Sequence, residues 1–116
     1  MKIYHNSRCK KSRAGLQYLQ EKGIECHVRE YLKDAITEEE FRDILLRLNK
    51  KPSELVRTQE TMYKKELKGK SFTEDEWMKI LLENPKLIQR PIVVGKYKAV
   101  LAQPPDEIDK LLKPNG

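Results

Sequence analysis

The stretch over residues 2–31 constrains the fold more than any other part of the chain. Lys2-Ile3-Tyr4 is the start expected of a buried strand, and residues 10–22 carry a helical pattern that ends at Gly23, where a glycine commonly terminates a helix. Residues 24–31 then alternate apolar and polar side chains, which predicts a second strand. Strand, helix and strand in this order predict a β-α-β unit with parallel strands and a right-handed crossover.

A cysteine lies where the first predicted strand gives way to the first predicted helix. Cys9 directly precedes the helix, where unpaired backbone N–H groups and the positive end of the helix dipole stabilise negative charge. Further positive charge comes from five nearby residues: His5, Arg8, Lys10, Lys11 and Arg13. We therefore expect the pKa of Cys9 to be lowered and its thiolate to be a nucleophile. The same N–H groups are suited to hold an oxyanion beside it.

The second cysteine, Cys26, has a structural interpretation. It alternates with Ile24 and Val28, which places it on the inward face of the second predicted strand. We therefore expect it to pack in the core rather than to take part in chemistry.

The middle of the chain is predicted to be helical. Capping boxes, each a threonine followed by a glutamate three residues later, begin at Thr37 and Thr73, and apolar residues at helical spacing follow both. Residues 59–67 predict a further short helix between them. We therefore expect a helical insertion over about residues 37–84.

The last third of the chain returns to strands. Ile92-Val93-Val94 and residues 97–101 flank Gly95-Lys96, which predicts a hairpin with a two-residue type II′ turn. A final helix begins with Pro105 near its first position. The order β-α-β, helical insertion, β-β-α predicts an α/β protein with a thioredoxin-like fold, formed as one domain of residues 1–116.

Charge and hydropathy exclude several classes of function. The 24 basic residues are interleaved with 18 acidic ones to give a net charge of +6, which disfavours nucleic-acid binding and favours an anionic substrate or an acidic partner. No apolar run is long enough for a membrane helix and no signal-peptide pattern precedes the first strand, so we expect a cytoplasmic protein that does not bind membranes. Two cysteines and two histidines without ligand spacing predict neither a disulfide framework nor a metal site. We expect a monomer.

Four blocks of the sequence stand out by their order and spacing. They are HNSRCKKSR at residues 5–13, VRTQE at 56–60, NPKLIQRPIVV at 84–94 and QPP at 103–105. Together they resemble the ArsC family, which comprises glutathione- and glutaredoxin-coupled arsenate reductases and their relatives. The resemblance runs over nearly the whole chain and implies an oxidoreductase that acts on an arsenate-like oxyanion. It implies no bound cofactor, with glutathione as co-substrate and glutaredoxin as partner.

The resemblance also implies roles for residues of the first block. Cys9 matches the catalytic nucleophile of the reductases, and His5 matches the histidine that helps to keep that cysteine ionised. Asn6 and Ser12 match loop positions that shape the anion pocket. With Ser12 in place of a second cysteine, the second thiol is expected to come from outside the chain.

The later blocks supply the residues that would hold the anion. Arg57 and Arg90 match two arginines that bind arsenate and its adduct with the thiolate, and Arg90-Pro91 matches a cis-proline edge of thioredoxin-like sites. The arsenate reductases carry a third arginine where this chain has Gln103. Loss of one charge-assisted contact to an oxyanion costs roughly 1.5–3 kcal/mol, about ten- to a hundredfold in binding.

The family also includes Spx-type regulators, non-catalytic proteins that bind RNA polymerase. These usually carry a Cys-X-X-Cys pair where this chain has Cys9 and Ser12, so a redox switch built on that pair is excluded. Two alternatives to an arsenate reductase remain: an Spx-like regulator without that switch, and a glutathione-dependent thiol reductase with another substrate.

Overall fold

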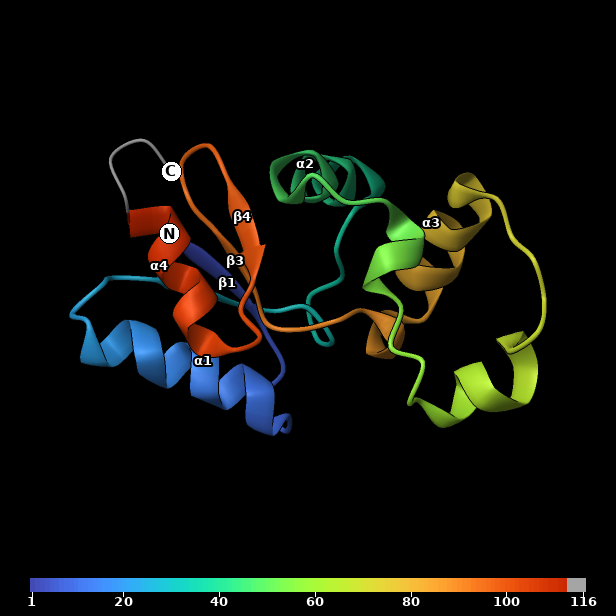
Figure 1. The fold of residues 1–116 in the computed structure, drawn as a ribbon, viewed down its shortest axis with the longest axis horizontal. Coiled ribbons are helices and arrows are strands. Elements are labelled where there is room, and N and C mark those ends of the chain that lie inside the picture. The colour runs from blue at the N-terminus through green and yellow to red at the C-terminus, as the bar shows by residue number, and fades with distance from the viewer. Residues whose placement is uncertain (113–116) are drawn as a thin grey trace.

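A four-stranded mixed sheet organises the half of the molecule that contains the N-terminus (Figure 1). The computed structural model describes residues 1–112. The strands are β1 (Lys2–His5), β2 (His27–Glu30), β3 (Ile92–Val94) and β4 (Ala99–Leu101), in the spatial order β2-β1-β3-β4. β1 and β2 are parallel, whereas β3 is antiparallel to both β1 and β4. The predicted β-α-β unit and α/β class are therefore confirmed.

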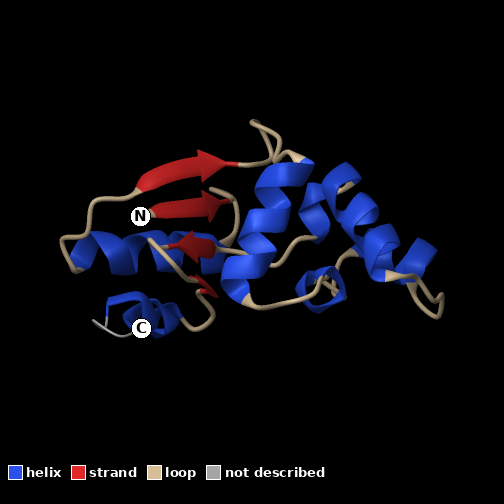
Figure 2. Ribbon diagram, turned by 90° about the horizontal axis from the view of Figure 1, so that it is seen from above, coloured by secondary structure: helices blue, strands red, loops and turns tan. Residues whose placement is uncertain are grey.

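Helices cover both faces of this sheet and form the second half of the molecule. In chain order the helical segments are α1 (Lys10–Glu21), α2 (Glu38–Leu48), η1 (Pro52–Leu55), η2 (Tyr63–Leu67), α3 (Glu74–Glu83), η3 (Pro85–Leu87), η4 (Pro105–Ile108) and α4 (Asp109–Leu112). Figure 2 shows the segments between α2 and η3 gathered beside the sheet rather than over it. The molecule is accordingly elongated, with extents of 42 × 28 × 23 Å.

Two apolar clusters hold these layers together, because neighbouring residues of a strand point to opposite faces of the sheet. Ile3 of β1 belongs to a cluster with Leu19 of α1 and Ile108 of η4. The next residue, Tyr4, belongs to a larger cluster that includes Phe41 of α2 and continues into the helical half. The sheet therefore lies between α1 with η4 on one face and α2 on the other.

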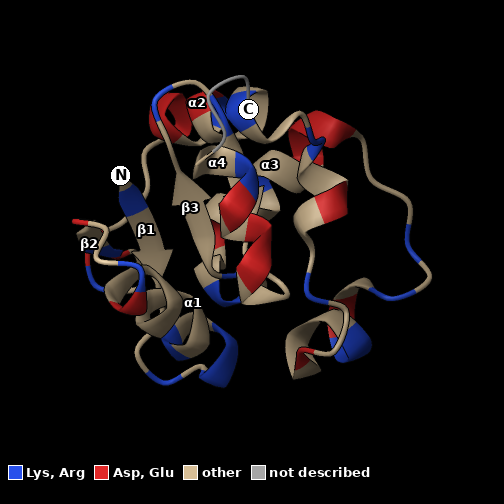
Figure 3. Cartoon of the chain, turned by 60° about the vertical axis from the view of Figure 1, so that its left-hand side comes forward, with Lys and Arg blue, Asp and Glu red and all other residues tan. Residues whose placement is uncertain are grey.

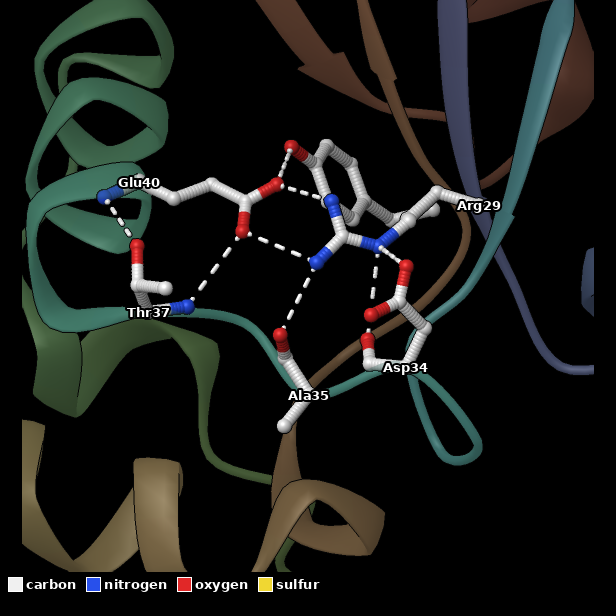
Figure 4. Close-up of polar contacts among 6 residues, drawn as sticks. Arg29, Asp34, Ala35, Thr37 and Glu40 are labelled. Carbon is white, nitrogen blue, oxygen red and sulfur yellow. Dashed lines mark hydrogen bonds and ion pairs between the residues drawn. The ribbon is translucent and has the colours of Figure 1, made fainter.

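A polar network fastens α2 to the sheet (Figure 4). Arg29 of β2 donates from Nη1 to Glu40 Oε2 at 2.6 Å, and its Nη2 donates to the carbonyl oxygen of Ala35 at 2.8 Å. Asp34 Oδ2 lies 2.8 Å from Arg29 Nε, and the Tyr4 hydroxyl donates to the same Glu40 oxygen at 2.6 Å. The side chains of Arg29 and Glu40 are only 17% and 18% exposed, so this pair is shielded from water and each charge depends on the other.

The capping signals are confirmed. The Thr37 hydroxyl accepts from the Glu40 N–H while the Glu40 side chain accepts from the Thr37 N–H, and the equivalent pair at Thr73 begins α3. α1 ends before Gly23, which has φ +70° as expected of a helix-terminating glycine. The helix predicted over 59–67 is present only from residue 61.

The hairpin prediction is wrong in its turn. The Gly95 N–H donates to the Lys98 carbonyl oxygen at 2.7 Å, so the loop consists of Lys96 and Tyr97 rather than of Gly95 and Lys96. Gly95 serves close packing instead: an added Cβ would lie 3.3 Å from the Lys98 oxygen and 3.5 Å from Leu111 Cδ2. A pattern of apolar runs around a Gly-X pair does not reveal that contact.

The second strand is shorter than predicted. It begins at His27 rather than at residue 24, and Val28 is 40% exposed because β2 is an edge strand. Cys26 lies just before the strand, is half-buried and packs against the Ile3 cluster, as expected for a structural thiol. Burial raises the pKa of Cys26, which keeps this thiol protonated. Within residues 1–112, none of the helices is long and apolar enough to cross a membrane.

Candidate active site

The sulfur of Cys9 lies at the N-terminus of α1. Cys9 is the N-cap residue, and its N–H donates to the Asn6 carbonyl oxygen at 3.0 Å, which closes the loop between β1 and the helix. Burial alone would raise the pKa of Cys9. The Arg90 side chain and the N–H groups of Ser12 and Lys11 stabilise the thiolate more strongly, and they lower the pKa from 9.0 to about 7.

The first turn of α1 is unusual in its charge. It contains no acidic residue, whereas α2 and α3 each begin with three acidic residues that complement the helix dipole. Figure 3 shows the acidic start of α2 in red. Lys10, Lys11 and Arg13 occupy the corresponding part of α1. No acidic side chain of this first turn competes with the Cys9 thiolate or with a bound anion for the helix N-terminus.

The polar residues of the loop hold it in shape. The Ser12 side chain is fully buried, and its Oγ accepts from the Asn6 N–H at 3.3 Å. The Asn6 Oδ1 accepts from the Arg8 N–H at 3.0 Å. Both side chains are thus occupied by backbone groups, and they position the turn that carries Cys9.

His5 does not add the positive charge expected of it. It is the last residue of β1 and is 5% exposed, and burial lowers its pKa, although Glu30 opposes this. The imidazole is therefore neutral at pH 7. Among residues 1–112 its Nδ1 has no hydrogen-bond partner. His5 is suited to hydrogen bonding at the site rather than to charge stabilisation.

Arg57 and Arg90 come from two segments that lie side by side. The Arg57 N–H donates to the Leu87 carbonyl oxygen at 2.7 Å, and the Gln89 N–H donates to the Leu55 carbonyl oxygen at 2.8 Å. These two bonds flank an antiparallel bridge between residues 56 and 88. This short pairing brings together two arginines that are far apart in the sequence.

Neither guanidinium group is fully paired. Arg90 is 7% exposed, and its Nη1 donates to the Lys86 carbonyl oxygen at 2.8 Å. Arg57 Nη2 lies 3.6 Å from Glu60 Oε2. Arg90 Nε and Arg57 Nε and Nη1 are buried without a partner in the described part of the chain. A buried donor without a hydrogen bond lowers the stability of the fold, so these atoms are available to a ligand that accepts hydrogen bonds.

The cis peptide expected at Arg90-Pro91 is present. α1 approaches this proline closely because it has a glycine there: a Cβ at Gly15 would lie 2.7 Å from Pro91 Cγ. Gln103 also serves this junction, since its Nε2 donates to the Arg90 carbonyl oxygen and its Oε1 lies 3.4 Å from Lys11 Nζ. Gln103 is therefore engaged with the protein itself.

Tyr31 joins His5, Cys9, Arg57 and Arg90 in one polar cluster, but it was not identified from the sequence. It follows β2 and is 1% exposed, and its hydroxyl has no partner within residues 1–112. Burial raises the pKa of Tyr31, while the Arg90 and Arg57 guanidinium groups oppose the rise, so the phenol lies close to both. Its place at the end of an apolar-polar alternation marked it only as part of a strand.

A pocket of about 370 Å³ opens beside the cluster. It is lined by residues of both charge signs from the cysteine loop, the end of β2 and the arginine segments: His5, Asn6, Ser7, Arg8, Glu30, Leu32, Lys33, Glu60, Lys86 and Arg90. Nine of its ten lining residues have polar or charged side chains, with both cationic and acidic groups among them, which suits a small ligand that carries both an amine and carboxylates.

Residues 4–111 match the ArsC family. The chain belongs to this family. It is 40% identical over 110 residues to the uncharacterized protein YfgD of Escherichia coli K12, covering 93% of this chain and 92% of that one. It is 33% identical over 114 residues to an arsenate reductase of Neisseria meningitidis, covering 97% of each chain.

Other ArsC-like relatives differ in their named roles. The structure matches the arsenate reductase of Vibrio cholerae with a TM-score of 0.87 at 34% identity, over 96% of this chain and 98% of that one. The chain is also 30% identical over 112 residues to the regulatory protein MgsR of Bacillus subtilis, covering 96% of this chain and 89% of MgsR. Membership of the ArsC family thus fixes the fold and leaves reductases and a regulator among the similar proteins.

Proposed function

We propose that this protein is a thiol-dependent reductase of the arsenate type, with Cys9 as nucleophile. The observation that supports this best is a thiolate-stabilising helix N-terminus next to two incompletely paired arginines. A negatively charged substrate compensates the arginines, and about half of the nearby sulfur is ionised at pH 7, so the same residues serve binding and attack.

In the first step, Arg57, Arg90 and the loop N–H groups hold arsenate beside Cys9. The thiolate sulfur forms a bond to arsenic, and one arsenate oxygen leaves as water after protonation. Arsenic remains in the +5 state, and the arginines balance the charge on the remaining oxygens. Asn6 and Ser12 keep the loop N–H groups in place during this step.

The two electrons for reduction come from outside the chain. A glutathione thiol displaces a second oxygen as water, and a glutaredoxin thiolate then attacks the glutathione sulfur. The bond between the glutathione sulfur and arsenic breaks, and its electron pair passes to arsenic. This gives arsenic(III), still bound to Cys9, and a glutathione–glutaredoxin disulfide. Water releases arsenite and restores the Cys9 thiol. The pocket of mixed charge beside His5 and Arg90 is the expected place for glutathione, which has one amine and two carboxylates. Such electron donors imply a reducing compartment such as the cytoplasm.

The test is arsenate-dependent NADPH consumption in an assay that supplies glutathione, glutaredoxin and glutathione reductase. We expect turnover by the wild type and none above background by Cys9→Ser. Cys26→Ser is the matched control, because Cys26 is a protonated thiol that precedes β2 and packs against the Ile3 cluster, so its replacement should leave turnover unchanged. Equal rates for the wild type and Cys9→Ser would refute the proposal.

The similarity to MgsR supports a second candidate, a non-catalytic regulator that binds RNA polymerase. A pull-down with purified RNA polymerase separates the two proposals. Retention of polymerase together with no oxyanion turnover favours the regulator, whereas turnover without retention favours the enzyme.

A further inference from the structure

Tyr31 is a buried phenol with an unused hydroxyl group. Its hydroxyl oxygen is one of five buried side-chain nitrogen and oxygen atoms within residues 1–112 that have no hydrogen-bond partner. The other four belong to His5, Arg57 and Arg90. Within the described chain, every buried side-chain nitrogen or oxygen without a partner therefore comes from Tyr31, His5, Arg57 or Arg90.

The electrostatic surroundings show where the hydroxyl lies. Burial raises the pKa of Tyr31 most, Arg90 and Arg57 lower it and the Cys9 thiolate raises it, so the buried phenol lies in the electrostatic field of all three groups. With its lone pairs facing guanidinium groups, the oxygen has its proton left to donate. No acceptor for that proton is found within residues 1–112.

What the cluster lacks is an acceptor with several lone pairs. A buried unpaired hydroxyl is destabilising, and so is a buried guanidinium N–H without a partner. A tetrahedral oxyanion offers lone pairs in several directions at once and carries the charge that two arginines need. One protein group could not satisfy donors that come from the end of β2 and from the two arginine segments.

We infer that the Tyr31 hydroxyl donates a hydrogen bond to the tetrahedral oxyanion held between Arg57 and Arg90. This rests on the proposed function for the identity of the anion and adds a neutral donor to its binding site. Tyr31 thereby contributes to affinity through a directed contact and adds no further charge.

The test compares Tyr31→Phe with Tyr4→Phe. Each substitution removes one buried hydroxyl, but the Tyr4 hydroxyl is already bonded to Glu40 at 2.6 Å. Arsenate and phosphate serve as probes, and their Kd is measured from the rise in Tm and from protection of Cys9 against iodoacetamide. Tyr31→Phe should weaken both anions about ten- to a hundredfold, with an anion-free Tm that is unchanged or higher. Tyr4→Phe should lower the anion-free Tm and leave both Kd values unchanged.

An anion Kd for Tyr31→Phe that equals the wild-type value overturns the inference. If the pH midpoint for Cys9 alkylation also rises, the hydroxyl is assigned to the thiolate instead. Failure of the proposed function looks different: a wild type that binds arsenate but does not turn it over contradicts the enzyme proposal and leaves the Tyr31 contact intact.

Discussion

The ionisation of Cys9 gives the sharpest prediction. A pKa of about 7 leaves about half of the sulfur as thiolate at pH 7, against about one part in a hundred for a thiol with the ordinary value of 9.0. The intrinsic nucleophilicity of a thiolate falls with its pKa, by roughly six- to tenfold over two units. The net gain in alkylation rate at pH 7 is therefore only about fivefold. The midpoint of the rate against pH is a clearer readout than the rate itself.

The perturbation is Arg90→Gln, which removes the charge and the strongest thiolate donor while keeping a polar side chain. A hydrogen bond to a charged group contributes about 1.5–3 kcal/mol, and one pKa unit corresponds to about 1.4 kcal/mol, so the midpoint should rise by about one unit or more. The experiment follows iodoacetamide alkylation by mass spectrometry from pH 5 to pH 10 in a Cys26→Ser background, where Cys9 is the sole thiol.

Arg57→Gln is the matched control. It removes the other arginine of the cluster, which is not among the main causes of the Cys9 shift, and it should move the midpoint less than Arg90→Gln does. A wild-type midpoint near 9, or equal midpoints for the wild type and Arg90→Gln, would refute the electrostatic account of the site.

Two further predictions concern the stability of the fold. Gly15→Ala should destabilise the protein by about 1–2 kcal/mol. The added methyl group would lie 2.7 Å from Pro91 Cγ, and the free-energy cost of this overpacking exceeds the gain in helix propensity. An unchanged or raised Tm would contradict this. Glu40→Gln should cost about 2 kcal/mol at pH 7, because it removes the shielded carboxylate that pairs with Arg29 and leaves the more exposed Asp34 as the remaining counter-charge. Burial raises the pKa of Glu40, but Tyr4 and Arg29 more than offset it, so the net pKa lies below 4.5. The stability that Glu40 supplies is present above pH 4.5 and is lost as the pH falls through the lowered pKa. Urea unfolding at pH 7 and pH 3 should show the difference from wild type shrinking, and an equal difference at both pH values would exclude the charge pair as its cause.

Local signals made most of the fold predictable. A capping box needs only residues three apart, and the glycine that ends α1 needs only its own backbone freedom, so both were read correctly from the sequence. The errors arose where a distant contact decided the local structure. Leu111 of α4 packs beside Gly95 at the turn, and Val28 is exposed because β2 lies at the edge of the sheet.

The same distinction applies to the candidate site. Cys9 was identifiable because strand, loop and helix are consecutive, and the helix N-terminus acts on it directly. Arg57, Arg90 and the other matched positions came from resemblance to a family, since nothing local separates them from surface arginines. Tyr31 was missed because its surroundings are formed by segments far along the chain.

Hydrogen-bond satisfaction separates two kinds of buried arginine in this protein. Arg29 has a carboxylate, a carbonyl oxygen and a second carboxylate around its guanidinium group, and it joins α2 to the sheet. Arg57 and Arg90 are as well shielded from water, but within residues 1–112 they keep donors without partners. Replacing Arg57 by the shorter and uncharged Gln removes two of these unpaired donors, so the anion-free Tm should stay the same or rise whether or not the donors bind an anion. If they are held for an anion, the same variant loses the stabilisation that arsenate or phosphate gives the wild type. Hydrogen bonds to a bound ligand would offset the free-energy cost of these donors, and the sulfur of Cys9 lies beside them.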